Sequence, residues 1–305
     1  TSSNFTSSRG VQTTVKDYIN RSISDILNAE INWPFTRAEG SVDAIAGKQL
    51  YSFASIASTL KYIDYDNVFL MPKDYITNGD FEISGSASIT NWATISGSPA
   101  ASSKFGNTLL LTSAKSSQEV EDLIVGKSYV ILIQTSGATL TLDVGTSSGG
   151  TQTKTTTLTI ASGNEVLLSE VTFTATATTH YVTFTESAGA TAYVKLVQLA
   201  ENITPIGLKY ISYEEYSERY RERDSRPDTD KFSDPEFIYT TYNDEIGLSP
   251  IPDTSNRTIK FDYYTSNVDL SAHDDTGIIP TRFESVINAR AKYYTYMFRS
   301  DVQTA

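Results

Sequence analysis

Residues 78–82 read Asn-Gly-Asp-Phe-Glu and open a long segment, residues 78–201, that is dominated by Ser, Thr, Gly and Ala and carries few charges. Short runs of alternating polar and apolar residues recur through it, separated by Gly, Ser and Asn. This pattern is typical of an antiparallel β-sandwich, and the many Thr residues suit strands with one solvated face. The runs expected to be strands are Leu109–Thr112, Glu119–Asp122, Tyr129–Gln134, Thr139–Val144, Thr155–Ile160, Glu165–Phe173, Tyr181–Thr185 and Tyr193–Leu199.

The two flanks of this segment share a different character. Residues 1–77 mix charges, aromatic residues and helix formers, and residues 202–305 return to charge and are rich in Tyr. Neither flank alone is long enough for a comfortable core, whereas together they make one domain of ordinary size. We therefore predict a discontinuous parent domain, residues 1–77 and 202–305, with residues 78–201 inserted into it as a β-sandwich domain. The alternative is three domains in a row.

Two long helices are expected near the chain ends. Apolar residues recur at three- and four-residue spacing over Val11–Leu27, and this helix should end before Pro34 because the residue before a proline avoids the α region. Pro280 opens the second helix, where its missing N–H costs nothing, and an apolar stripe follows over Phe283–Phe298. We expect these two helices to pack on each other and to close the parent domain.

Short strands and one charged helix are expected between the long helices. Ser212 is a suitable N-cap with two glutamates in the following turn, so a helix is predicted over Tyr213–Arg223. Gly47-Lys48 indicates a hairpin turn. The predicted fold class is α+β: a helical parent domain with short antiparallel strands, plus an inserted antiparallel β-sandwich of the jelly-roll type. The strands expected in the parent domain are Ser41–Ala46, Gln49–Phe53, Leu60–Tyr65, Asn67–Met71, Leu208–Ile211, Phe237–Tyr242, Ile246–Leu248 and Thr258–Tyr264.

Composition excludes several classes of site. The chain has no Cys, which excludes disulfides, thiolate catalysis and Cys-based zinc sites, and its two histidines, His180 and His273, lie far apart in the sequence. No apolar run approaches the ~20 residues that span a bilayer. The polar N-terminus is unlike a secretory signal, so we expect a protein made in a cytoplasm. A formal net charge of −12 argues against a basic face that wraps nucleic acid.

Catalysis is not expected from this sequence. Adjacent carboxylates occur at Glu214/Glu215, Asp274/Asp275 and Glu121/Asp122, but neighbours in sequence do not face each other across a cleft as acid–base chemistry requires. We find no Gly-rich phosphate loop, nucleophile elbow or metal motif. His273 stands next to Asp274, but the sequence offers no evident Ser nucleophile for them. The prediction is a protein without enzymatic activity and without a cofactor.

The opening of the middle segment resembles that of carbohydrate-binding-module-like jelly rolls. In those domains an Asn-Gly-Asp-Phe-Glu strand leads to a tryptophan, here Trp92, and a Gly-Lys-x-Tyr motif, here Gly126–Tyr129, begins a central strand. The resemblance implies the fold and leaves sugar binding open. The residues that could stack on a sugar ring are Trp92, Phe105 and Tyr181, of which Trp92 is also a candidate for the core.

Two other roles stay open for the middle domain. Some folds of this kind bind calcium, and Asp80 and Glu82 offer two carboxylates for such an ion. Alternatively, the domain has no ligand and serves to decorate or stabilise the surface of a particle. The motif alone does not decide among sugar binding, calcium binding and decoration.

The flanks, read without the insertion, resemble podovirus head-to-tail adaptors, also called tail tubular protein A. The order of the motifs carries the resemblance, because each motif alone is weak. The insertion between Asp74 and Thr204 is the departure, since the simplest members lack it. The matching stretches are the N-terminal helix, Trp33-Pro34-Phe35, Ala46–Tyr51, Tyr62–Leu70, Leu208–Tyr216, Ile259–Tyr264 and Ile279-Pro280 before a Tyr-rich helix.

This second resemblance implies a homo-oligomeric ring, usually of twelve copies, between the portal and the tail nozzle of a phage particle. Such a ring helps retain packaged double-stranded DNA and later passes it outward without reading its sequence; it assembles in the host cytoplasm, and tail fibres are further neighbours. A ring interface needs two different complementary patches on each subunit. Expected contacts with the portal or a neighbouring subunit are Arg282, Arg290, Lys292 and Arg299, and expected intersubunit contacts are Tyr213, Tyr216, Arg219, Tyr220 and Arg223.

Two functions are therefore predicted from the sequence. The main one is a structural virion protein, the head-to-tail adaptor that forms part of the DNA conduit. The alternative is a glycan- or receptor-binding tail component that acts through the β-sandwich. The charge-rich stretch Arg219–Arg226 does not discriminate between them, because such a run is usually a solvated helix face or a salt-bridge network.

Overall fold

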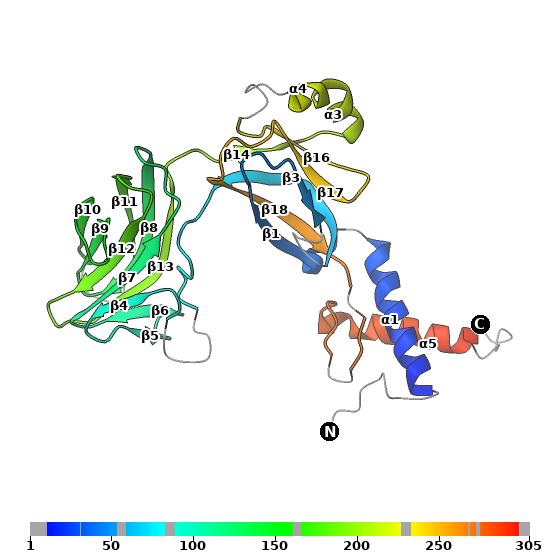
Figure 1. Cartoon of the computed structure of the whole chain (residues 1–305). Coiled ribbons are helices and arrows are strands. Elements are labelled where there is room, and N and C mark those ends of the chain that lie inside the picture. Colours follow the sequence, from blue (N-terminus) through cyan, green and yellow to red (C-terminus); the bar gives the residue numbers. More distant parts are fainter. Residues whose placement is uncertain are drawn as a thin grey trace. The chain divides into compact units, whose positions relative to one another are not determined.

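The computed structural model divides the chain into two compact units (Figure 1). Unit 1 comprises residues 1–71 and 206–305, and unit 2 comprises residues 72–205. The structure describes residues 11–30, 32–53, 59–82, 89–160, 166–226, 233–267, 269–272 and 275–298. Among these residues no helix is long and apolar enough to cross a bilayer.

Unit 2 is an antiparallel β-sandwich, as its composition predicts. Its described residues form two five-stranded sheets, with strand orders β10-β9-β12-β7-β4 and β11-β8-β13-β6-β5. Consecutive strands often lie in different sheets, which requires both sheets to form together. The strands are β4 (Ala93–Ser96), β5 (Ala100–Ser102), β6 (Thr108–Leu111), β7 (Ala114–Val120), β8 (Ser128–Gly137), β9 (Leu140–Gly145), β10 (Lys154–Leu158), β11 (Leu167–Thr174), β12 (His180–Glu186) and β13 (Ala192–Glu201).

One continuous core fills the space between these two sheets. Strand alternation explains it: Tyr129, Ile131 and Ile133 on β8 point inward and are fully buried, and Val182 and Phe184 do the same from β12. The register of β12 against β7 and β9 continues without a break, so each inward side chain has an inward partner on both sides.

The Asn-Gly-Asp-Phe-Glu stretch is a tight structural turn beneath this core. Asn78 has a positive φ of 53°, and its side-chain oxygen accepts a hydrogen bond from the Glu82 N–H at 2.7 Å. Gly79 lies against β13, because a Cβ there would come 2.0 Å from the carbonyl oxygen of Val197. The turn places Phe81 in the core, where its ring packs on Trp92. The motif is therefore explained by packing.

Unit 1 combines helices with two four-stranded sheets in its described part. The strand orders are β1-β18-β3-β14 and β15-β16-β17-β2. It is thus a mixed α+β body rather than a helical domain with accessory strands. The strands are β1 (Arg37–Asp43), β2 (Leu50–Ser52), β3 (Leu60–Pro72), β14 (Ile206–Gly207), β15 (Lys209–Tyr210), β16 (Phe237–Thr240), β17 (Glu245–Ser249) and β18 (Arg257–Thr265), and the helices are α1 (Val11–Ala29), η2 (Pro34–Thr36), α3 (Tyr213–Arg219), α4 (Arg221–Ser225), η4 (Thr281–Phe283) and α5 (Glu284–Phe298).

The hairpin predicted at Gly47-Lys48 is wrong. A turn does form there, with Gly47 at a φ of 74°, but the strands on either side of it do not pair with each other. β1 pairs with β18 and β2 pairs with β17, so each finds its partner in the distant C-terminal flank. The two strands expected at Leu60–Tyr65 and Asn67–Met71 are one long strand, β3.

The helix predicted over Tyr213–Arg223 divides into α3 and α4 at Tyr220. Its N-cap is as expected, because the Ser212 hydroxyl accepts a hydrogen bond from the Glu215 N–H at 3.1 Å. The side chain of Gln49 fastens this helical segment to the sheet: its amide donates to the Tyr216 hydroxyl at 2.8 Å and to the buried Asp224 carboxylate at 3.1 Å.

The helices at the two chain ends, α1 and α5, pack on each other within unit 1 (Figure 1). The carboxylate of Asp25 on α1 accepts hydrogen bonds from the Arg290 guanidinium and from the Tyr294 hydroxyl on α5. A small apolar cluster, in which Ile23, Leu27 and Ile279 are buried, lies beside this contact. The sequence prediction that the two ends fold together is thus met by direct side-chain contacts.

Candidate functional site

A hollow of about 410 Å³ lies on unit 2, on the outer face of the sheet that contains β4, β7 and β12. It combines two aromatic residues, Trp92 and Tyr181, with side chains that can donate and accept hydrogen bonds. This combination is typical of a site that orients a polar ligand. The residues that line it are Asn91, Trp92, Ala93, Ser117, Glu119, Ser148 and Tyr181.

Strand register brings these side chains together. Tyr181 on β12 lies opposite Glu119 on β7, and Ser117 lies opposite Ala93 on β4. Because side chains alternate along a strand, residues on either side of Tyr181 turn inward, and Val182 is accordingly buried in the core. The hollow therefore has a rigid floor made of three hydrogen-bonded strands.

Tyr181 and Glu119 form the central pair of the hollow. The Tyr181 hydroxyl donates a hydrogen bond to Oε1 of Glu119 at 2.8 Å, which fixes the tilt of the ring. This bond to a carboxylate, with desolvation and the charges of Glu119 and Glu121 as smaller causes, raises the pKa of Tyr181, so the hydroxyl keeps its proton. The ring stays half-exposed, and its carboxylate partner is exposed.

The floor and one edge of the hollow are held by hydrogen bonds. Beneath the pair, the Thr183 hydroxyl donates to the Ser117 hydroxyl at 3.0 Å, and both residues are buried. At the edge, the side-chain amide of Gln118 donates to the carbonyl oxygens of Thr77 and Asn91, at 2.7 and 3.2 Å. Asn91 adopts a positive φ of 70° and is exposed, so its side-chain amide stands at the rim.

The connection between β9 and β10 forms the opposite wall of the hollow through Ser148. The ammonium group of Lys115, on the same face of β7, donates to the carbonyl oxygen of Gly149 at 2.9 Å. Within the connection, the Gly150 N–H donates to the Ser147 carbonyl at 2.8 Å and closes a turn. The wall is thus tied to the sheet at a defined point.

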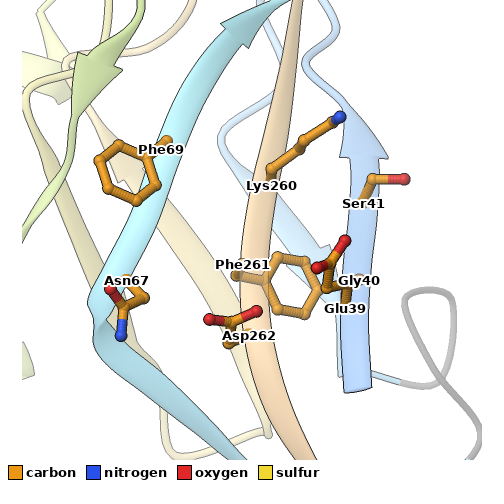
Figure 2. Close-up of a pocket in the computed structure, with 8 residues that line it drawn as sticks. All are labelled: Glu39, Gly40, Ser41, Asn67, Phe69, Lys260, Phe261 and Asp262. Carbon is orange, nitrogen blue, oxygen red and sulfur yellow. The ribbon is translucent and has the colours of Figure 1, made fainter. Parts of the chain in front are cut away.

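A second hollow, of about 400 Å³, lies on unit 1 over β1, β18 and β3 (Figure 2). On its floor the ring of Phe261 lies against Gly40, where a Cβ would come 2.6 Å from the ring. Phe69 stands exposed on β3. Asp262, one of its carboxylates, is already ion-paired with Arg37. We do not assign this hollow a ligand.

Of the three aromatic residues expected to stack on a sugar, Trp92 and Tyr181 both line the hollow, whereas Phe105 does not. Trp92 belongs to the core, where it packs on Phe81 and Phe184 and donates its N–H to the Asn78 carbonyl. Phe105 has its ring against Tyr193, next to the other sheet. Trp92 is only 7% exposed, so Tyr181 has the more accessible of the two rings that line the hollow.

The structure does not add a third ligand to Asp80 and Glu82, the two carboxylates that the sequence offers for calcium, among the described residues. Asp80 and Glu82 are both exposed, and the contacts of Glu82 in the turn are made by its backbone with Asn78. The described residues contain no group of three or more His, Asp or Glu side chains that could hold a metal ion.

The tyrosines of the predicted intersubunit contact make contacts inside unit 1. Tyr216 is 5% exposed and stacks on Tyr239 with ring centroids 3.9 Å apart, and Tyr220 packs on Phe237. Burial, followed by the hydrogen bond with Tyr216, raises the pKa of Tyr239 far above its ordinary value.

The predicted contact arginines are also engaged within unit 1. Arg223 donates to Asp224 at 3.1 Å and to the Ser249 hydroxyl at 2.9 Å, and Arg219 forms an exposed ion pair with Glu215 one helical turn away. Their predicted contacts with another subunit stay predictions.

The basic residues of α5 differ in their surroundings. Arg290 is held by Asp25, Arg282 lies over the ring of Phe283, and Lys292 is exposed. Arg299 lies outside the described residues. Their predicted contacts with a portal or a neighbouring subunit stay predictions.

Four polar residues of the unit 2 hollow were not singled out by the sequence: Asn91, Ser117, Glu119 and Ser148. Glu119 lies in a predicted strand and could have been paired with Tyr181 if the strand order had been known. Ser148 lies in a connection whose path follows from the Lys115 contact, for which the sequence gives no signal.

Comparison with known proteins gives distant similarities. No protein-family model and no curated protein sequence matches the chain. The enzymatically active domain of tailspike protein 4 of bacteriophage CBA120 is similar at 14% identity and a TM-score of 0.34, over 42% of this chain and 21% of that one.

Two carbohydrate-binding modules are similar at the same level. TmCBM61, solved with β-1,4-galactotriose, has 16% identity and a TM-score of 0.33, over 43% of this chain and 99% of that one. A family 16 carbohydrate-binding module has 14% identity and a TM-score of 0.33, over 42% of this chain and 99% of that one. At these TM-scores the assignment of a β-sandwich rests on the sheet topology of unit 2 itself.

Proposed function

We propose that the chain is a glycan-binding component of a phage tail and that unit 2 binds the glycan in the hollow around Tyr181. The observation that carries the proposal is the pairing of a half-exposed aromatic ring with a carboxylate at 2.8 Å on a rigid sheet face. The phage context comes from the resemblance of the flanks to adaptors of tailed phages.

The chemistry of the hollow suits a sugar. A pyranose has an apolar face, which stacks on an aromatic ring, and a rim of hydroxyl groups, which pair with fixed polar groups. Tyr181 offers the ring. The second carboxylate oxygen of Glu119 can accept a hydrogen bond, and the exposed side-chain amide of Asn91 can both donate and accept. We propose binding without cleavage, since a single carboxylate lines the described part of the hollow and glycoside hydrolysis uses two.

The test is binding of the full chain to glycans with and without the ring. Tyr181→Ala should weaken binding about tenfold or more, because it removes the stacking surface. The matched control is Phe105→Ala, which removes an aromatic ring next to the other sheet and should leave affinity unchanged. Retained affinity in Tyr181→Ala, or an equal loss in both variants, would contradict the proposed site. Release of reducing sugar during incubation would contradict binding without cleavage.

A head-to-tail adaptor ring is the second candidate function, and the contact between α1 and α5 favours it. The adaptor resemblance lies in both flanks, and the contact makes those flanks one body. The proposed partners are further copies of the chain, the portal and the tail nozzle. Negative-stain electron microscopy of the purified chain tests it: closed rings support the adaptor, whereas monomers at micromolar concentration count against it. The two candidates are compatible if unit 1 assembles and unit 2 binds.

A further inference from the structure

We infer that the hollow of unit 2 takes neutral or amino-substituted glycans and rejects acidic ones, and that Glu119 sets this selectivity. The inference rests on the proposed function and adds the charge class of the ligand. Among the described residues that line the hollow, Glu119 is the one with a charged side chain. A ligand that stacks on Tyr181 therefore lies next to a carboxylate that accepts from the same tyrosine at 2.8 Å.

The surrounding charges strengthen this negative character. The charge of Glu121, near the end of β7, acts on the Tyr181 hydroxyl together with that of Glu119. Asp143 lies on the same outer face of β9, opposite Thr183, and the Thr155 hydroxyl donates to it at 2.8 Å. Three carboxylates thus belong to the sheet face that carries the hollow.

Among the described residues, Lys115 is the cation on this face, and its position limits what it can do for a ligand. Lys115 lies on β7, two residues before Ser117, and its ammonium group donates to the carbonyl of Gly149 in the β9–β10 connection. It is not among the residues that line the hollow. An acidic sugar bound at Tyr181 would meet Glu119 before it could reach a cation.

The physical consequence is a difference in affinity that depends on salt. Like charges a few ångströms apart near a protein surface repel enough to change affinity by roughly tenfold. The effect is screened as salt rises, because the Debye length falls from about 10 Å at 0.1 M to about 3 Å at 1 M. Sugar hydroxyls feel no such repulsion, and a protonated amino group would be attracted to Glu119.

A glycan array probed with the full chain tests the inference. The array should hold neutral glycans, glycans with uronic or sialic acids, and glycans with free amino groups, read at low and at high salt. We expect binding to neutral or amino glycans, and acidic analogues of the same backbone at least about tenfold weaker at low salt. Acidic glycans bound as well as neutral ones would overturn the inference and leave the proposed function intact. No binding to any class would overturn both.

Two charge variants assign the selectivity to the hollow. Glu119→Gln keeps an oxygen that can accept from the Tyr181 hydroxyl but removes the charge, so the disadvantage of acidic glycans should shrink several-fold. Glu170→Gln makes the same change of net charge on β11, an exposed position of the other sheet, and should leave the disadvantage unchanged. If both variants shift selectivity equally, the net charge of −12 causes the exclusion and the assignment to Glu119 is wrong.

Discussion

The two units build their cores in different ways. Unit 2 has one continuous core between two sheets, made from a single uninterrupted stretch of chain. Unit 1 has three separate apolar clusters, and its sheet and helix contacts join residues from opposite ends of the sequence. An inserted domain with its own core can fold without help from its host, whereas the host depends on contacts that close around the insertion.

The two hollows differ in the same sense. The hollow of unit 2 carries polar side chains on a sheet whose opposite face packs against the core. In the hollow of unit 1, the buried ring of Phe261 lies against Gly40, and Asp262 is already ion-paired with Arg37 (Figure 2). A comparable volume is thus a candidate ligand site in one unit and is assigned no ligand in the other.

The largest expected effect comes from opening the single core of unit 2. Phe184→Ala should lower the free energy of unfolding of unit 2 by about 3–5 kcal/mol, because it leaves a cavity between Trp92 and the opposite sheet. Each unit holds one of the two tryptophans, Trp33 in unit 1 and Trp92 in unit 2. Single-tryptophan versions of the chain, made by Trp→Phe changes, therefore report the denaturation of each unit by fluorescence.

Because unit 2 has its own core, the loss of stability caused by Phe184→Ala should be confined to unit 2. The transition reported by Trp92 should move and the one reported by Trp33 should not. Val125→Ala, an exposed apolar residue of the same unit, is the matched control and should change stability by less than about 0.5 kcal/mol. A joint shift of both transitions would show that the two units unfold together, which would contradict a separate core in unit 2.

The next effect tests whether the turn at residues 78–82 serves packing. Gly79→Ala should destabilise unit 2 by about 1–3 kcal/mol, because the new Cβ meets the backbone carbonyl of Val197, which cannot rotate away. Gly207→Ala in unit 1 is the control: its Cβ would lie 3.9 Å from the ring of Phe69, an ordinary contact. Denaturation curves with the two tryptophan probes separate them, and a neutral Gly79→Ala would show that the turn is held less firmly than its contacts indicate.

Sequence reasoning was most successful where contacts are local. The strands and core of unit 2, the N-cap at Ser212 and the two end helices follow from alternation, spacing and capping chemistry. The packing of α1 on α5 also follows from the sequence, because neither flank is long enough to bury a core alone. These predictions depend on physical rules that act within a few residues or on a shortage of apolar material.

Sequence reasoning failed where partners lie far apart. The predicted hairpin at Gly47-Lys48 is absent because β1 pairs with β18. The residues around the turn do not indicate this distant partner. The site was predicted in part: Tyr181 was named, but Glu119 became its partner only through the register of β12 on β7. The sequence does not decide between core and site for Trp92; the structure buries its ring beside Phe81 and leaves its edge in the lining of the hollow.

A smaller effect concerns a buried carboxylate of unit 2. Glu186 accepts hydrogen bonds from the N–H groups of Ser113 and Ala188 at 2.7 and 2.8 Å, and from Ala190 at 3.4 Å. Burial alone would raise the pKa of Glu186, but these donors outweigh it and hold the pKa below its ordinary value of 4.5. The contribution of ionised Glu186 to the stability of unit 2 is therefore fully present above pH 4.5. It is lost as the pH falls from 4.5 towards the lower pKa that Glu186 has in the folded state.

The variant Glu186→Gln should lower the stability of unit 2 at pH 7 by about 1–2 kcal/mol, because a charged acceptor becomes a neutral one. Its stability should also fall less steeply than that of the natural chain as the pH drops below 4.5. Urea denaturation followed through Trp92 at several pH values measures both. Parallel pH profiles for the two proteins would mean that the backbone donors do not favour the ionised form. Unit 1, followed through Trp33, should show no difference between them.

The smallest effect concerns the contact that closes unit 1. Asp25→Ala removes the partner of Arg290 and Tyr294 and should lower the stability of unit 1 by about 0.5–1 kcal/mol. Both charged side chains are more than a third exposed, so solvent screens the pair. Glu222→Ala, which breaks an exposed ion pair between α4 and its C-cap residue Arg226, is the control and should cost still less. If Asp25→Ala is neutral while Ile23→Ala costs about 2–4 kcal/mol, the apolar cluster alone joins the helices. If neither substitution matters, α1 and α5 fold independently, and the two flanks would no longer form one body.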